Sequence, residues 1–114
     1  MNMKEEYNKL VRDNIPQIIA STKKYPLSTI LFDNHEYLWA LKQKLIEECN
    51  EVLKATNDEM MINELADCLE VIDAIMKHCD ISLDEVMEYK EEKAIKNGKF
   101  DNRVYLISVS DSRE

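Results

Sequence analysis

Two stretches decide the fold of this chain: residues 41–53, Leu-Lys-Gln-Lys-Leu-Ile-Glu-Glu-Cys-Asn-Glu-Val-Leu, and residues 63–72, Asn-Glu-Leu-Ala-Asp-Cys-Leu-Glu-Val-Ile. Apolar side chains recur every three or four residues in both, which is the spacing of one face of an α-helix. The sequence therefore predicts two long helices joined by a short break. Acidic residues stand on both helices, and their positions relative to the apolar faces indicate a function.

Glu64 and Asp67 lie inside the apolar stripe of the second helix. At about 100° per residue, Met61, Cys68 and Val71 fall within about 60° of Glu64. A carboxylate on a buried stripe is costly unless a partner compensates its charge. Converging carboxylates cannot compensate one another, whereas a hard divalent cation such as Mg²⁺, which prefers oxygen ligands, can do so. This placement favours a metal site.

The acidic residues of the first helix are less decisive. Glu48 and Glu51 are three residues apart and share a face. Glu47 and Glu51 also suit a solvated face that includes Asn50 and Lys54. On this helix alone, a metal site and a solvated face fit the spacing equally well.

Composition limits the class of protein. The chain has 114 residues, enough for one domain with a modest core. It contains one glycine and two prolines, and this scarcity suits a mostly helical, all-α fold. The net charge of −8, with no basic run, argues against a nucleic acid polymer as partner. A small phosphorylated ligand bridged by a metal remains compatible with that charge.

The sequence also indicates a compartment. The first residues lack the apolar core of a signal peptide, and no apolar run approaches membrane-spanning length. We therefore expect no membrane association. The three cysteines are odd in number and have no close pair, so we expect a reducing cytoplasm and no disulfide. Cys49 and Cys68 lie on apolar faces, which favours buried packing over zinc binding.

Three places carry the spacing of a capping box, in which a side-chain oxygen at the helix start is followed by glutamate three residues later. They predict helices at about 34–55, 57–78 and 83–97. Gly98 is a candidate left-handed stop for the last helix. Pro16 suits the first turn of a short leading helix. The capping pairs are Asp33 with Glu36, Thr56 with Glu59, and Ser82 with Glu85.

The rest of the chain completes a single domain over residues 1–110, an antiparallel helical bundle, with a loose tail at 111–114. Residues 103–109 are β-branched and apolar and predict a strand, which could pair with 28–32 as a minor two-stranded β element. The second long helix is apolar around more than half of its circumference and must be buried on several sides. We therefore expect a homodimer, unless the leading helix and the strands suffice to cover it.

The acidic residues resemble a known signature. Glu47-Glu48-x-x-Glu51, twelve residues and Glu64-x-x-Asp67 resemble that of the all-α nucleotide pyrophosphohydrolases, which include MazG, the dimeric dUTPases and phosphoribosyl-ATP pyrophosphohydrolase. The flanks look closest to the phosphoribosyl-ATP pyrophosphohydrolase-like branch of predicted house-cleaning enzymes. These flanks are Tyr-Asn-Lys-Leu-Val-Arg-Asp-Asn-Ile-Pro at 7–16, and Lys93 followed by Gly98-x-Phe100 and Arg103-Val104-x-Leu106. Asn14 departs from the branch, which often has lysine there.

The resemblance implies a MazG-like bundle, a dimer or dimer of dimers, and hydrolysis of a nucleoside triphosphate to monophosphate and pyrophosphate. The cofactor would be Mg²⁺, with Mn²⁺ as a substitute. Such ions neutralise phosphate charge and lower the pKa of the water that attacks the α-phosphorus. Carried over by position, the metal ligands would be Glu48, Glu51, Glu64 and Asp67, and Glu47 would support them or act as the base that orients water.

Four cations are candidates for holding the phosphate tail: Lys9, Arg12, Lys93 and Arg103. For Lys9 and Lys93 taken singly, ordinary surface charge is the simpler interpretation. Two other functions stay open. One is true phosphoribosyl-ATP hydrolysis in histidine biosynthesis. The other is a non-catalytic helical module that binds a nucleotide or a partner without releasing pyrophosphate.

Two aromatic residues on the first long helix, Tyr37 and Trp39, could stack on a nucleotide base. Aromatic side chains at helical spacing more often belong to a core, because they bring a large apolar surface to be buried.

Overall fold

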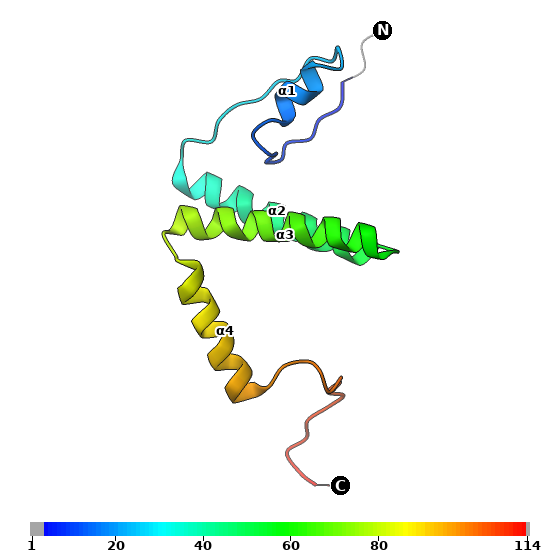
Figure 1. The fold of residues 1–114 in the computed structure, drawn as a ribbon, viewed down its shortest axis with the longest axis vertical. Coiled ribbons are helices and arrows are strands. Elements are labelled where there is room, and N and C mark those ends of the chain that lie inside the picture. Colours follow the sequence, from blue (N-terminus) through cyan, green and yellow to red (C-terminus); the bar gives the residue numbers. More distant parts are fainter. Residues whose placement is uncertain (1–3, 114) are drawn as a thin grey trace. The chain divides into compact units, whose positions relative to one another are not determined.

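A computed structural model describes residues 4–113 and contains four helices within them (Figure 1): α1 (Ile15–Ala20), α2 (Asn34–Lys54), α3 (Asp58–Cys79) and α4 (Leu83–Asn97). The chain is all-α over this range, with no strand or sheet. The short leading helix is confirmed, and so are the three longer ones, whose predicted bounds are correct to within one residue. The contacts divide the chain into two compact units, Met1–Asp80 and Ile81–Glu114.

Side-chain caps fix where the longer helices begin. Asp33 and Ser82 each accept a hydrogen bond from the backbone amide three residues on, at 2.9 Å and 3.1 Å, as their capping-box spacing predicts. The cap of α3 was predicted one residue too early. Asn57, not Thr56, accepts the backbone N–H of Met60, at 2.8 Å. Asparagine is the stronger N-cap residue of the two, so it takes the position.

Residues with positive φ angles end the last two helices. Gly98 has φ 84°, which glycine tolerates without steric penalty, and its N–H donates to the carbonyl of Ala94 at 2.9 Å. Its ψ of 179° lies outside the left-handed helical region that the sequence suggested. Asp80 ends α3 in that left-handed region, with φ 55° and ψ 43°. Aspartate is one of the few non-glycine residues that adopt it readily.

The predicted strand at 103–109 and its pairing with 28–32 are wrong for this structure. Both segments are irregular, and all their residues are exposed except Leu31, which is half-buried. Apolar, β-branched residues fit a pleated and half-buried surface, but they do not create one, and an isolated two-stranded pair is marginal in water. Arg103, at the start of the expected strand, has φ 59°, far from the β region. Residues 111–113 form no helix or strand, and residue 114 lies outside the described residues.

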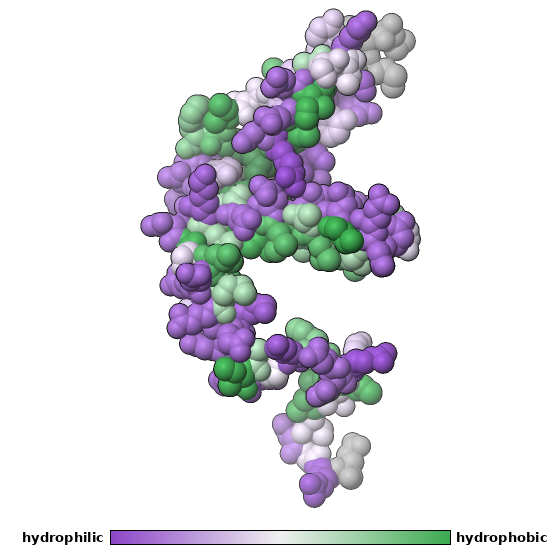
Figure 2. Space-filling view, in the orientation of Figure 1, coloured by the Kyte–Doolittle hydropathy of each residue, from purple (hydrophilic) through white to green (hydrophobic). Residues whose placement is uncertain are grey.

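In the first unit, α2 and α3 pack side by side (Figure 1). Only residues 55–57 separate them, and so short a connection makes them an antiparallel hairpin. The core between them is small, because Leu41 and Val71 are the only apolar residues buried in the described chain. Figure 2 shows apolar side chains along one exposed side of this helix pair.

Candidate metal centre

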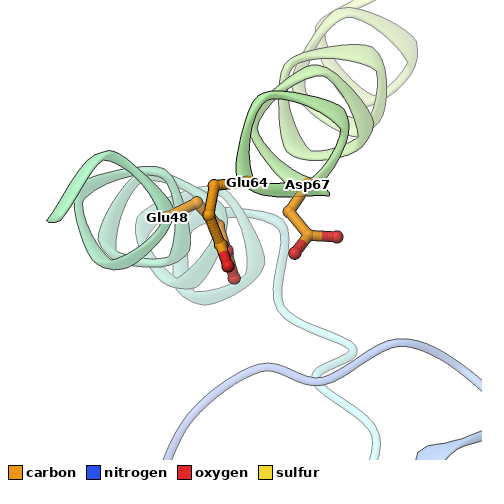
Figure 3. A group of neighbouring side chains, drawn as sticks. All are labelled: Glu48, Glu64 and Asp67. Atoms are coloured by element: carbon orange, nitrogen blue, oxygen red, sulfur yellow. The ribbon is translucent and has the colours of Figure 1, made fainter. Parts of the chain in front are cut away.

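Three carboxylates meet between α2 and α3. Glu48 from α2 and Glu64 and Asp67 from α3 each offer one oxygen, and these oxygens all lie within 4.8 Å of one another. Figure 3 shows the three side chains leaving the two helices on the same side. Opposite ligands of an octahedral Mg²⁺ are about 4.2 Å apart, twice a bond of about 2.1 Å. The three oxygens are near enough for side-chain rotation to bring them onto one such ion, whose neighbouring ligands are about 3.0 Å apart.

Helical periodicity explains why these residues converge. Glu48 lies seven residues after Leu41, and Glu64 lies seven residues before Val71, so each acid shares a face with a buried core residue two turns away. The antiparallel hairpin turns those two faces toward each other. Asp67 joins them because it lies three residues after Glu64. The acids thus occupy the continuation of the core, as their position in the apolar stripe predicted.

Glu48 is the least exposed acid of the group, with 9% of its surface accessible. Its charged neighbour is the ammonium of Lys44, one turn earlier on α2, at 3.4 Å. Over residues 4–113, no group donates it a hydrogen bond. A carboxylate with so little water around it needs a positive charge beside it. The chemistry of the group, three hard oxygen donors with one of them nearly buried, fits Mg²⁺ or Mn²⁺.

Glu47 and Glu51 point to other partners. Glu47 accepts hydrogen bonds from Lys9 at 2.9 Å and from Lys44 at 3.4 Å. Glu51 pairs with Lys54 at 3.4 Å near the end of α2. The structure therefore brings together three of the five predicted acids. Glu51 lies outside the group of three, and its role as a ligand stays a prediction.

The neighbours of Glu47 keep it ionised. Partial burial by itself would raise the pKa of this carboxyl, but the hydrogen bond from Lys9 and the positive charge of Lys44 outweigh burial and lower it. The same hydrogen bond raises the pKa of the Lys9 ammonium, against the opposing effect of its burial. Both groups are therefore charged at neutral pH.

Arg12 reaches the metal group directly. Its guanidinium Nη2 donates to Oδ1 of Asp67 at 2.8 Å, so in this structure it neutralises an acid. The sequence singled out Arg12 and Lys9 as cations but gave no sign of these partners, which lie 55 and 38 residues away. Lys93 and Arg103 are exposed residues of the second unit, and their roles toward the acids stay predictions.

Neither the two aromatic candidates nor the three cysteines belong to the group of three carboxylates. Tyr37 packs edge-on against His78, with ring centroids 4.9 Å apart, whereas Trp39 is 64% exposed. The three cysteines are free, in agreement with the prediction of no disulfide. Cys49 is exposed rather than buried, contrary to the expectation from its apolar face. Cys68 is half-buried, and burial together with its neighbour Cys49 raises the pKa of its thiol.

Comparisons with known protein families, with curated proteins and with solved structures found no match to this chain. Among the described residues, none of the helices combines the length and the apolar character needed to span a membrane.

Proposed function

We propose that this chain is a Mg²⁺-dependent nucleotide pyrophosphohydrolase of the MazG-like kind. It would convert a nucleoside triphosphate to a monophosphate and pyrophosphate. In a house-cleaning role, this substrate would be a noncanonical nucleotide. The observation that supports this proposal is the convergence of Glu48, Glu64 and Asp67 from two antiparallel helices. These are three of the positions at which the resemblance places metal ligands, and their converging negative charges favour a divalent cation.

Each acid has a role in this proposal. Glu48, Glu64 and Asp67 would hold the cation, and Glu51, one turn after Glu48, would be a further ligand. A bound Mg²⁺ would neutralise charge on the phosphates. Glu47 has a lowered pKa and is therefore a weak base at neutral pH. Its role is to orient water by hydrogen bonding rather than to remove a proton.

A nucleotide panel tests the activity. Canonical triphosphates, oxidised and deaminated triphosphates, and phosphoribosyl-ATP are each assayed for pyrophosphate release with Mg²⁺, with Mn²⁺ and with excess EDTA. We expect equal amounts of pyrophosphate and monophosphate, only when a divalent cation is present. Turnover of phosphoribosyl-ATP alone would assign the chain to histidine biosynthesis.

The matched variants are Glu64→Gln in the metal group and Glu70→Gln, an exposed residue on α3. Glu64→Gln should abolish pyrophosphate release and Glu70→Gln should leave it unchanged. Activity that persists in EDTA, or inorganic phosphate as the only product, would refute the proposal. Metal or nucleotide binding without turnover of any nucleotide would favour a binding module instead.

We also propose that the chain acts as a homodimer. Two apolar rows on the hairpin are exposed: Trp39, Ile46 and Leu53 on α2, and Ile62, Leu65 and Leu69 on α3, all 48% to 84% accessible. Within each row the spacing is three to seven residues, so its members share a helix face. A second copy of the hairpin would cover these rows and complete a four-helix bundle.

A further inference from the structure

The segment before α1 lies against the acidic site through two long-range ion pairs. Lys9 Nζ is 2.9 Å from Oε1 of Glu47, and Arg12 Nη2 is 2.8 Å from Oδ1 of Asp67. The segment is irregular, with Asn8 at φ 46°. Both cations are exposed on their outer side, with 40% and 56% of their side chains accessible. They are therefore held in place by the acids and not by a packed core.

The two ion pairs differ in whether their acid belongs to the group of three carboxylates. Asp67 belongs to the group of three carboxylates, whereas Glu47 does not. A guanidinium stays protonated at all physiological pH values, so Arg12 cannot leave Asp67 by losing its charge. A divalent cation that takes the same carboxylate would lie within a few ångströms of Arg12 and repel it. A divalent cation on Asp67 would therefore weaken the Arg12 ion pair, whereas Lys9 pairs with Glu47, which lies outside the group of three.

We propose that Arg12 is a displaceable counter-ion of the metal site, occupying Asp67 until a divalent cation binds and then being released beside the site. The Lys9–Glu47 pair keeps the segment in place, so the freed guanidinium stays within reach of an anionic group brought by a ligand. Metal binding thus prepares the cation that receives a phosphate, which orders the two binding events. This inference rests on the proposed metal site and adds its regulation.

The reactivity of Arg12 tests the release. The chain has three arginines, Arg12, Arg103 and Arg113, so phenylglyoxal labelling followed by peptide mass spectrometry reports on each separately. We expect Mg²⁺ to raise the labelling rate of Arg12 by roughly two- to five-fold, the factor that corresponds to a partly exposed ion pair. Arg113 serves as the internal control and should label at the same rate with and without Mg²⁺.

The affinity for Mg²⁺, measured by calorimetry, tests the competition from the other side. Coupling between two binding events is reciprocal. If bound Mg²⁺ weakens the Arg12–Asp67 pair by some factor, removing Arg12 should raise the affinity for Mg²⁺ by the same factor. Arg12→Gln should therefore bind Mg²⁺ about two- to five-fold more tightly than the parent. Lys9→Gln should change the affinity less, since Lys9 does not touch the group of three. Lys24→Gln, an exposed residue of the same unit, controls for the change in net charge.

The outcomes separate this inference from the function on which it rests. If the parent binds Mg²⁺ but neither Arg12 labelling nor the affinity of Arg12→Gln changes, the displacement is refuted and the metal site stands. If Arg12→Gln and Lys24→Gln gain equally, the effect is one of net charge, and the displacement is again refuted. If neither the parent nor Arg12→Gln binds Mg²⁺ at millimolar concentration, the metal site itself is refuted.

Discussion

The carboxylate of Glu64 faces two other acids in the metal-free protein. Its carboxylate lies within 4.8 Å of oxygens of Glu48 and Asp67, and its nearby donor is the amide of Asn63 at 3.4 Å. Glutamine has nearly the same shape without the charge, so Glu64→Gln should relieve repulsion and desolvation. We expect its metal-free melting temperature to equal or exceed that of the parent, with a gain of up to about 1 kcal/mol in unfolding free energy.

Added Mg²⁺ should raise the melting temperature of the parent, because it binds the folded site and not the unfolded chain. That increment should disappear in Glu64→Gln and persist in Glu70→Gln. Thermal melts in EDTA and in Mg²⁺ measure both effects. A metal-free loss of stability combined with an unchanged Mg²⁺ increment would make Glu64 an ordinary structural residue.

The ion pair of Lys9 and Glu47 should depend on pH at its acidic end. The folded state lowers the pKa of Glu47, so the pair stabilises the protein above the unfolded carboxyl pKa of about 4.3. This contribution is lost as the pH falls through the lowered pKa of the folded state. A double-mutant cycle of Lys9→Gln and Glu47→Gln in EDTA should give a coupling of about 0.2–1 kcal/mol at pH 7. The coupling should decrease as the pH is lowered through the acidic range; a coupling independent of pH would exclude the charge as its origin.

At the level of the helices, the start of α3 distinguishes two neighbouring cap candidates. Asn57 accepts the N–H of Met60, whereas the hydroxyl of Thr56 points to the sulfur of Met60 at 3.5 Å. Asn57→Ala should therefore cost about 1 kcal/mol in unfolding free energy. Thr56→Ala should cost a few tenths, the usual range for an exposed substitution. Urea unfolding of the two variants measures the difference, and equal losses would contradict the assigned cap.

Features that depend on residues close together in the sequence were predictable. Capping spacing predicted the starts of α2 and α4 and placed that of α3 within one residue, because a cap involves residues three or four positions apart. Helical periodicity placed Glu64 and Asp67 on the buried stripe for the same reason. The prediction of a strand at 103–109 was wrong, because strand formation depends on a partner segment rather than on composition alone.

The part of the site that escaped prediction is non-local. Arg12 and Lys9 reach acids 55 and 38 residues away, and no spacing rule covers such pairs. Their type and charge made them candidates for binding phosphate, but only the structure shows them on the acids. The separation of Glu51 from the three converging carboxylates has a similar origin. It depends on the direction of the Glu51 side chain near the end of α2, where its carboxylate pairs with Lys54.

At the level of the whole molecule, the exposed apolar rows predict association. We expect light scattering at micromolar concentration to give at least twice the chain mass of 13.4 kDa. Leu69→Glu places a charge in the α3 row and should shift the mass toward the monomer. Lys77→Glu, an exposed polar position on the same helix, should leave it unchanged. A monomeric mass for the parent would show that the hairpin does not use these rows to pair.

The position of Glu48, Glu64 and Asp67 on the faces that also carry Leu41 and Val71 has an evolutionary consequence. Apolar replacements of such acids extend the core, so they raise heat resistance while destroying the cation site. A population of this gene selected only for survival of the folded protein would lose these three acids early. Their retention in a lineage therefore reports continuing selection for the chemistry they perform.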